Sequence, residues 1–303
     1  MKINICYEIK DGPFGGGNQF LKALRNEFCE RSELYTDDPS TADVILFNSH
    51  HSIEELVNMK KTYPNKVYVH RIDGPMRLYN NMEDIRDHIV YALNQEYADA
   101  TIFQSNWSYT ANLEMGMNIN KPFSIIPNAP DPQIFNKDYE KKEDDKLKLI
   151  ATSWSDNVKK GFKYYDFLDK NLDFDKYQFS FVGRSPIKFK NINMLGALST
   201  QEVAETLRNH DVYITASEHD PCSNSLIEAL TCGLPVVALN SGGHSELVQN
   251  GGLLFESTED LLDKLEEMLC NTDELRDNIS VKTIKDIANE YVSFFEKMNE
   301  ETK

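Results

Sequence analysis

Short runs of β-branched and aromatic residues alternate with segments of helical periodicity along most of the chain. This alternation is typical of parallel sheets whose faces are covered by helices. In the first part of the chain the pattern predicts strands at 2–9, 43–49, 66–72, 100–105 and 123–128. It then restarts and predicts strands at 147–154, 177–183, 192–196, 211–217 and 235–240. We therefore expect two successive α/β units.

A proline-rich and strongly charged stretch separates the two units. The sequence IPNAPDPQIFNKDYEKKEDD contains three prolines and a dense run of charges, as exposed inter-domain connections do. We assign residues 1–130 to the first domain, 131–146 to the linker and 147–280 to the second domain. Within 281–303, apolar residues recur at helical spacing and predict an amphipathic helix. The first domain is the candidate to cover its apolar stripe.

Charge and hydropathy narrow the classes of partner. The chain has 32 basic and 49 acidic residues, a net charge of −17, which argues against nucleic acid as a partner. No apolar run reaches the ~18 residues that span a bilayer, and the opening MKINICYEIK lacks the apolar centre of a signal peptide. We expect a cytoplasmic protein with at most peripheral membrane association. The five scattered cysteines, without a CxxC pair, indicate reduced thiols.

Polar and glycine-rich turns follow several predicted strands, and ligands bind at such turns in open α/β sheets. The first turn, KDGPFGGGNQF, leaves the amides of Gly15, Gly16 and Gly17 uncovered at a helix start, which suits an anion. A flexible turn without a ligand is the alternative. The second turn, TSWSDNVKKGF, places Lys159 and Lys160 before a helix, where an ammonium can bind phosphate or be merely solvated.

The third turn belongs to the stretch DPCSNSLIEALTCGLPVVALNSGGHSELV. Its helix is predicted to start near Ser225 and to end before Gly233. Ser225 and Glu228 match the capping box S-x-x-E, which would account for Glu228 structurally, and turn formation would account for Asp220. Alternatively, the amides between the two carboxylates bind an anion, while Asp220 and Glu228 accept hydroxyls of a phosphorylated sugar.

No pattern predicts a metal site. Asp173 and Asp175 form a DxD in a predicted turn between a helix and a strand, and the histidines lack metal-ligand spacing. A GxSxG nucleophile motif is also missing from the sequence.

Taken together, these motifs resemble those of retaining nucleotide-sugar glycosyltransferases of family 4. Members of that family carry an acidic residue, seven further positions, a glutamate, a small-residue helix end and GLPVVA. Here the stretch reads Asp220, PCSNSLI, Glu228 and ALTCGLPVVA. The glycine turn SGGHSELV is similar, as is ADATIFQSNWSYTANLEMG followed by SIIPNAPD, where family members usually read IPNGVD. The resemblance covers nearly the whole chain and implies an α/β protein of the GT-B fold, with two Rossmann-like parallel-sheet domains facing across a cleft.

The resemblance also implies roles for individual residues. Asp220 would contact hydroxyls of the donor sugar, Glu228 would hold the nucleotide ribose, and Lys160 would bind phosphate. Gly15 to Gly17 would form the donor-side glycine loop. The diphosphate would meet the start of the helix, formed by Ser223, Asn224, Ser225 and Leu226.

The chain departs from the family pattern at three places. Asp220 replaces the more usual glutamate, and the arginine expected before the lysine is missing, because SWSDNV occupies that turn. We expect Lys159, or Arg184 in FVGRSP, to supply the second positive charge. The first domain is compact, and His70 and Asp73 in VHRIDGP are expected to face the acceptor.

The implied activity is transfer of a sugar, with retention, from a nucleotide-diphosphate sugar to a hydroxyl of a glycan or lipid-linked acceptor, in glycan or cell-envelope polysaccharide synthesis. Lysine and helix amides would compensate the charge of the leaving diphosphate, so no metal or other cofactor is expected to be required. Two alternatives stay open. One is a non-catalytic nucleotide-sugar-binding protein, and the other is a GT-B sugar-nucleotide epimerase.

Overall fold

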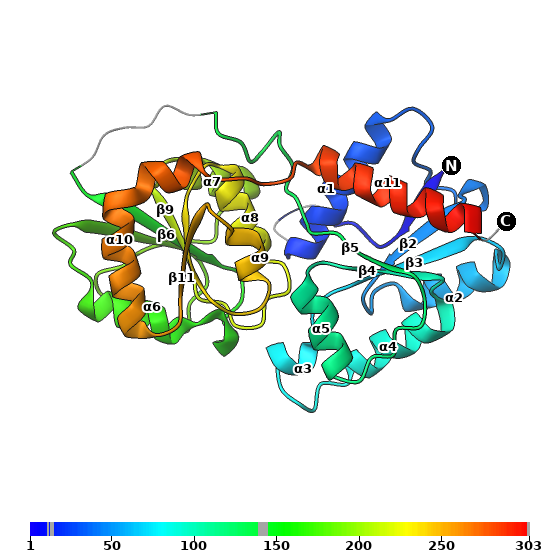
Figure 1. The fold of residues 1–303 in the computed structure, drawn as a ribbon, viewed down its shortest axis with the longest axis horizontal. Helices are drawn as coiled ribbons and strands as arrows, with labels where there is room; N and C mark the ends of the chain where they lie inside the picture. Colours follow the sequence, from blue (N-terminus) through cyan, green and yellow to red (C-terminus); the bar gives the residue numbers. More distant parts are fainter. Residues whose placement is uncertain (11, 13–14, 139–144, 302–303) are drawn as a thin grey trace. The chain divides into compact units, whose positions relative to one another are not determined.

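The computed structural model describes residues 1–10, 12, 15–138 and 145–301. Its contacts divide the chain into two compact units (Figure 1). Unit 1 comprises Met1–Lys10, Gly17–Ala129 and Lys282–Lys303, and unit 2 comprises Asp11–Gly16 and Pro130–Val281. Residues 139–144 of the expected linker lie outside the described residues.

Unit 1 is built on a parallel sheet of five strands in the order β1-β2-β3-β4-β5. The strands are β1 (Ile3–Cys6), β2 (Val44–Asn48), β3 (Val67–Ile72), β4 (Ala100–Phe103) and β5 (Phe123–Ile125). A single parallel bridge from Ile3 to Tyr35 adds to β1 outside the named strands. Because all the strands are parallel, their carboxyl ends meet at one edge of the sheet.

Helices cover both faces of this sheet. The helical segments are α1 (Gly16–Glu30), η1 (Pro39–Thr41), α2 (Ile53–Thr62), α3 (Met76–Tyr79), α4 (Arg86–Tyr97), α5 (Asn106–Glu114) and α11 (Ile284–Glu301). Alternation along β2 shows the two layers: Val44 and Leu46 belong to a core shared with α1 and α11, whereas Ile45 and Phe47 pack with α2. The apolar stripe of α11 is buried in the unit 1 core.

Unit 2 contains a six-stranded parallel sheet in the order β11-β10-β9-β6-β7-β8. Its strands are β6 (Leu147–Ser153), β7 (Tyr177–Gly183), β8 (Asn193–Gly196), β9 (Val212–Thr215), β10 (Val236–Leu239) and β11 (Gly252–Phe255). Numbered within the unit, this is the doubly wound order 3-2-1-4-5-6. The order reverses between β6 and β9, which are hydrogen-bonded neighbours.

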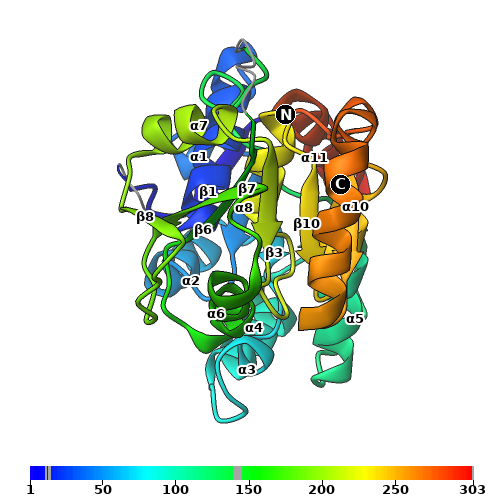
Figure 2. The ribbon, with the colours of Figure 1, turned by 90° about the vertical axis from the view of Figure 1, so that its left-hand side faces the viewer.

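Two helix layers also sandwich the unit 2 sheet. The helical segments are η2 (Val158–Lys160), α6 (Phe162–Asn171), α7 (Thr200–Arg208), α8 (Asn224–Thr231), α9 (His244–Val248) and α10 (Thr258–Asp277). Leu149 and Ala151 of β6 pack with α6 and α10, the side seen in Figure 2, whereas Ile150 packs with α7 and α8. Both units are thus α/β layers with parallel strands, which confirms the predicted fold class.

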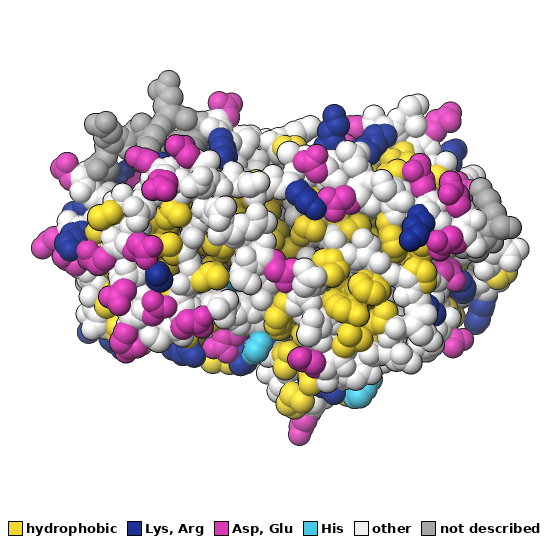
Figure 3. All heavy atoms as spheres, in the orientation of Figure 1, with side chains coloured by type: hydrophobic (Ala, Val, Ile, Leu, Met, Phe, Trp, Pro, Cys, Tyr) yellow, Lys and Arg dark blue, Asp and Glu magenta, His cyan; other side chains and the backbone are white. Residues whose placement is uncertain are grey.

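The surface charges and the polarity of the helices agree with the charge and hydropathy of the sequence. On the face shown in Figure 3, lysine and arginine side chains are interspersed among acidic ones. Within the described part of the chain, none of the helices combines the length and the apolar character that crossing a membrane requires.

Candidate functional site

The topology of unit 2 directs attention to the carboxyl ends of β6 and β9. In doubly wound sheets a crevice for ligands opens where the strand order reverses, because the connections from the two central strands leave toward opposite faces. The turn after β6 contains Lys159 and Lys160, and the turn after β9 contains Asp220. Both are turns that the sequence identified as ligand-binding candidates.

Lys160 and Asp220 lie together at this point. The Lys160 ammonium is 3.6 Å from the Asp220 carboxylate, and the side chains are 22% and 16% exposed. The two turns approach closely, since the Glu218 amide donates to the Lys159 carbonyl (2.7 Å). Gly161 has a φ of +76°, and a side chain there would overlap the Ala216 backbone, so the approach requires glycine.

Lys159 and Arg184, the two residues expected to supply the second positive charge, differ in their surroundings. The Lys159 ammonium is 2.8 Å from Glu218, which is also 3.1 Å from Lys163, so its charge is compensated within the protein. Arg184 follows β7, and its amide donates to the Ser153 carbonyl (2.7 Å). Its side chain is exposed, and no ion pair joins it to another residue in the described ranges. Arg184 is therefore the better placed of the two cations for an external anion.

The start of α8 differs from the predicted capping box. The helix begins at Asn224 with Ser223 as its N-cap residue, and no side chain caps it. Ser225 lies inside the helix, so the capping-box interpretation of Ser225 and Glu228 is wrong. The Ser225 hydroxyl instead lies 3.3 Å from that of Ser223. Backbone bonding begins with the Ile227 amide, which donates to Ser223 (3.1 Å), so the amides of Ser225 and Leu226 precede the first helical bond.

Glu228 is a half-buried carboxyl group on α8. Burial raises its pKa to about 8. Across the described part of the chain, no hydrogen bond or ion pair holds its oxygens. A half-buried carboxyl group that no protein group holds can form hydrogen bonds with a ligand.

The loop after β10 fixes the backbone of Asp220. The Gly243 amide donates to the Asp220 carbonyl (2.8 Å), and a side chain at Gly242, whose φ is +64°, would overlap the Asp220 backbone. The His219 amide donates to the Ser241 hydroxyl (3.0 Å). The glycine turn SGGHSELV therefore supports Asp220 directly, which the sequence pattern alone could not show.

The amino-terminal glycine loop is described in part, because Asp11, Pro13 and Phe14 lie outside the described residues. Gly15 is exposed, and Gly16 begins α1. A side chain at Gly16 would overlap that of Asn224, so these two predicted binding residues are in close contact. Side chains at Gly15 and Gly17 would meet open space.

His70 does not occupy the predicted position. Its ring is fully buried on β3, 2.9 Å through Nε2 from the Ser49 carbonyl and 3.3 Å through Nδ1 from Asn94. It stacks on Phe47 with ring centres 4.2 Å apart, and burial lowers its pKa to about 3. The expectation that His70 faces an acceptor is therefore wrong, because both of its ring nitrogens are already hydrogen-bonded inside the core.

Asp73, by contrast, stands at the carboxyl edge of the unit 1 sheet with its side chain 26% exposed. Gln104 and the wholly buried Arg71 donate to its carboxylate, the latter at 3.3 Å. Arg71 also donates to Asn48 and Asn128, both at 2.6 Å. These donors from the core orient the Asp73 carboxylate.

Two histidines, which the sequence motifs addressed only as metal ligands, lie at the same edge. His50 and His51 follow β2 and stack with ring centres 4.5 Å apart, and Tyr7 packs edge-on against His51 at 5.3 Å. Burial lowers the pKa of His51, although the Asp73 carboxylate opposes this shift. Their position directly after a predicted strand was the signal that could have identified them as residues of this sheet edge.

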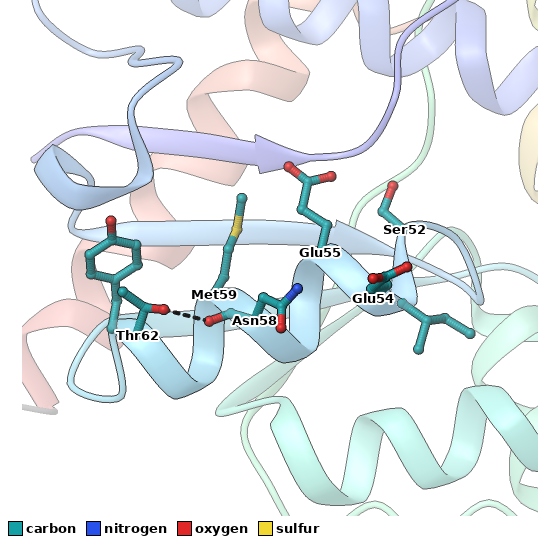
Figure 4. Close-up of a pocket in the computed structure, with 8 residues that line it drawn as sticks. Ser52, Glu54, Glu55, Asn58, Met59 and Thr62 are labelled. Carbon is teal, nitrogen blue, oxygen red and sulfur yellow. Dashed lines mark hydrogen bonds between the residues drawn. The ribbon is translucent and has the colours of Figure 1, made fainter.

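A separate hollow lies along α2 in unit 1 (Figure 4). Its lining includes Glu54, Glu55 and Met59, and the Thr62 hydroxyl donates to the Asn58 carbonyl at 2.8 Å. None of the predicted site residues lines it. This hollow is therefore distinct from the strand-end sites.

Comparison with known proteins links this geometry to glycosyl transfer. Residues 188–286, which include Asp220 and Glu228, match the family "Glycosyl transferases group 1". The chain is 24% identical over 245 residues to N,N'-diacetylbacillosaminyl-diphospho-undecaprenol alpha-1,3-N-acetylgalactosaminyltransferase of Campylobacter jejuni. That match covers 69% of this chain and 63% of the relative, less than two thirds of its length.

Similar solved structures cover the whole chain. Sucrose-phosphate synthase from Thermosynechococcus elongatus has a TM-score of 0.70 at 14% identity, covering 99% of this chain and 96% of that one. Anabaena HepE in complex with UDP-glucose has a TM-score of 0.65 at 16% identity, covering 100% and 98%. The fold is that of GT-B glycosyltransferases, and the family match supports a glycosyltransferase.

Proposed function

We propose that the chain is a retaining glycosyltransferase that moves a sugar from a nucleotide-diphosphate sugar to an acceptor hydroxyl in glycan synthesis. The observation that carries this proposal is the convergence of Lys160, Asp220 and the first turn of α8 where the strand order of unit 2 reverses. A cation, free helix amides and carboxylates are the groups that a sugar diphosphate requires.

The leaving diphosphate would be bound by Lys160 and the start of α8. Negative charge develops on it as the glycosidic bond breaks, and preorganised donors stabilise that charge. The Lys160 ammonium is 3.6 Å from Asp220, longer than a good charge-assisted hydrogen bond, so phosphate can compete for it. Loss of one such donor costs ~3 kcal/mol, or roughly a hundredfold in rate.

Glu228 would bind the nucleotide ribose. With a pKa that burial raises to about 8, its carboxyl group favours the protonated form at neutral pH. A protonated carboxyl group both donates and accepts, which matches a pair of neighbouring ribose hydroxyls. Asp220 would accept from hydroxyls of the donor sugar.

We expect no metal and no other cofactor to be required, because Lys160, Arg184 and the amides of α8 supply the positive groups. The acceptor would be a glycan or a lipid-linked sugar, in keeping with the lipid-linked acceptor in the name of the Campylobacter relative. Asp73 would face it at the carboxyl edge of unit 1. Association with a membrane would be peripheral.

A non-catalytic nucleotide-sugar-binding protein is the second candidate. The pairing of Lys159 with Glu218 favours it, because one expected cation is thereby withdrawn from the diphosphate. Such a protein would bind the donor without turnover.

A transfer assay separates these functions. Nucleotide sugars are incubated with saccharide and lipid-linked acceptors, with and without EDTA, and the product's anomeric configuration is read by NMR. We expect transfer with retention that EDTA leaves unchanged and that Lys160→Ala lowers roughly a hundredfold. Lys170→Ala is the control, since Lys170 pairs with Asp166 on the surface of α6. Donor binding without any turnover would identify the second candidate, and inversion at the anomeric carbon would contradict the retaining mechanism.

A further inference from the structure

We propose that His244 binds the donor sugar and that its Nε2 atom accepts a hydrogen bond from one sugar hydroxyl. This inference rests on the proposed function and adds a specificity residue to the same site. The sequence motifs assign no separate role to His244.

His244 is held at the edge of the site by the loop that supports Asp220. It is the first residue of α9, which follows β10 through Asn240–Gly243. The preceding residue, Gly243, donates its amide to the Asp220 carbonyl at 2.8 Å. The His244 side chain is itself 0% exposed.

The hydrogen bond at one ring nitrogen determines the state of the other. Nδ1 lies 2.8 Å from the Leu239 carbonyl, which can only accept, so Nδ1 carries the hydrogen. In a neutral ring Nε2 then presents a lone pair. Among the described residues, this buried Nε2 has no hydrogen-bond partner.

Burial favours the neutral ring, and two charged residues of the proposed donor site act on its pKa. Burial lowers the pKa of His244, the Asp220 carboxylate raises it, and the Lys160 ammonium lowers it. Both of these charges belong to the proposed donor site. The buried lone pair therefore lies within the electrostatic reach of the two groups expected to hold the sugar and the diphosphate.

The chemistry of the lone pair selects its partner. A buried acceptor without a donor is unfavourable, and a ligand that supplies a donor gains affinity there. Diphosphate oxygens at neutral pH carry no hydrogen to donate, whereas sugar hydroxyls do. We therefore assign the sugar to Nε2 and leave the diphosphate to Lys160 and α8.

Two substitutions divide the functions of the ring. His244→Asn places an amide nitrogen near the position of Nδ1, which keeps a donor for Leu239 and removes Nε2. His244→Gln reaches the position of Nε2 and can supply an acceptor oxygen. His210→Asn is the matched control, because His210 also uses Nδ1 toward a carbonyl, that of Thr206 at 2.7 Å, but precedes β9 at the opposite edge of the sheet.

Affinities for UDP and UDP-glucose, and for ADP and ADP-glucose, are measured by titration calorimetry. We expect His244→Asn to weaken binding of the sugar nucleotide about tenfold while the nucleoside diphosphate changes less than about twofold. His244→Gln should recover part of the loss, and His210→Asn should have no effect. On the wild type, one monodeoxy-sugar analogue should bind about tenfold more weakly, and His244→Asn should no longer distinguish that analogue from the parent.

Other outcomes overturn the inference. An equal loss for UDP and UDP-glucose would show that His244 only supports the loop, and no loss for either would show that Nε2 binds no sugar. If His244→Asn does not fold, as judged by its thermal unfolding, the deoxy-sugar series on the wild type decides, and uniform affinities would refute the role. If the wild type binds UDP-glucose and ADP-glucose no more tightly than UDP and ADP, the proposed role of His244 is refuted, whereas the nucleotide site is not. Failure to bind any of the four would refute the proposed function itself.

Discussion

Polar side chains at the carboxyl edges of the two sheets differ in how closely the protein itself pairs them. In unit 1, the two terminal nitrogens of buried Arg71 donate to Asn48, Asn128 and Asp73, although its Nε has no partner among the described residues. In unit 2, the Lys160–Asp220 pair is long, at 3.6 Å, and His244 Nε2 is unpartnered among the described residues. Buried polar groups that satisfy one another rigidify a structure, whereas those left unsatisfied indicate where a ligand completes the set.

The largest expected effect tests the satisfied network of unit 1. Arg71→Ala removes a charged donor from the side-chain oxygens of Asn48, Asn128 and Asp73 inside or at the edge of the core, so we expect the free energy of unfolding in urea to fall by about 3–5 kcal/mol. Arg25→Ala breaks a partly exposed pair with Asp37, 3.0 Å long, and should cost less than about 1 kcal/mol. Similar costs for the two variants would show that the Arg71 network contributes no special stability.

Lys160→Ala tests the opposite situation in unit 2. Because its ion pair is long and partly exposed, we expect the free energy of unfolding to change by less than about 1 kcal/mol. Turnover should nevertheless fall by roughly a hundredfold. A variant that loses stability and activity in parallel would mean that Lys160 is a structural residue.

Glu228 gives a pH-dependent prediction of intermediate size. Its pKa is raised from 4.5 to about 8, so its protonated form stabilises the fold below pH 4.5, and this contribution is lost as pH rises toward 8. The full pKa shift would correspond to roughly 5 kcal/mol, but solvent screens this half-buried group, so we expect the difference in unfolding free energy between wild type and Glu228→Gln to shift by about 2 kcal/mol across this range, against wild type at high pH. Urea unfolding at several pH values measures it.

Glu202 is the control for that experiment because its shift has the opposite sign. Hydrogen bonds from Ser199 in a capping box lower its pKa. Its contribution to stability is therefore present at neutral pH and lost on acidification. The difference in unfolding free energy between wild type and Glu202→Gln should accordingly change in favour of wild type as pH rises. The same slope for both variants would contradict the burial of Glu228.

The smallest expected effect distinguishes the two candidate cations. Arg184→Ala should weaken nucleoside-diphosphate binding about three- to tenfold, whereas Lys159→Ala should change it less than about twofold, because Lys159 already pairs with Glu218. Calorimetric titration with UDP and ADP measures both. The reverse order would return Lys159 to the diphosphate site.

Periodicity predicted the layers of both units better than it predicted the site. The strand expected at 177–183 matches β7 (Tyr177–Gly183), because a buried central strand gives a strong apolar signal. Strand β11 (Gly252–Phe255) escaped prediction, since it is short, starts with glycine and is only partly buried at the sheet edge. Local patterns suffice where burial follows chain spacing.

The prediction of site residues failed where the role of a residue depends on partners that are distant in the sequence. All six residues of β3 are buried, so alternation could not show that His70 points into the core toward Asn94 of α4. The S-x-x-E match misled because α8 begins at Asn224 rather than after Ser225. The state of His244 depends on the Leu239 carbonyl and on the neighbouring turns, which no local motif encodes.

Thermal unfolding of the wild type, Glu228→Ala and Lys160→Ala with UDP, GDP, ADP, CMP and their sugar conjugates, with and without Mg²⁺, tests the donor site most directly. A ligand at a hundred times its dissociation constant stabilises by ~2.7 kcal/mol, which raises the unfolding midpoint by a few degrees. We predict a shift with one nucleotide series in the absence of metal, and its loss in both variants. No shift with any nucleotide, or an undiminished shift in both variants, would contradict a donor site at Lys160 and Glu228.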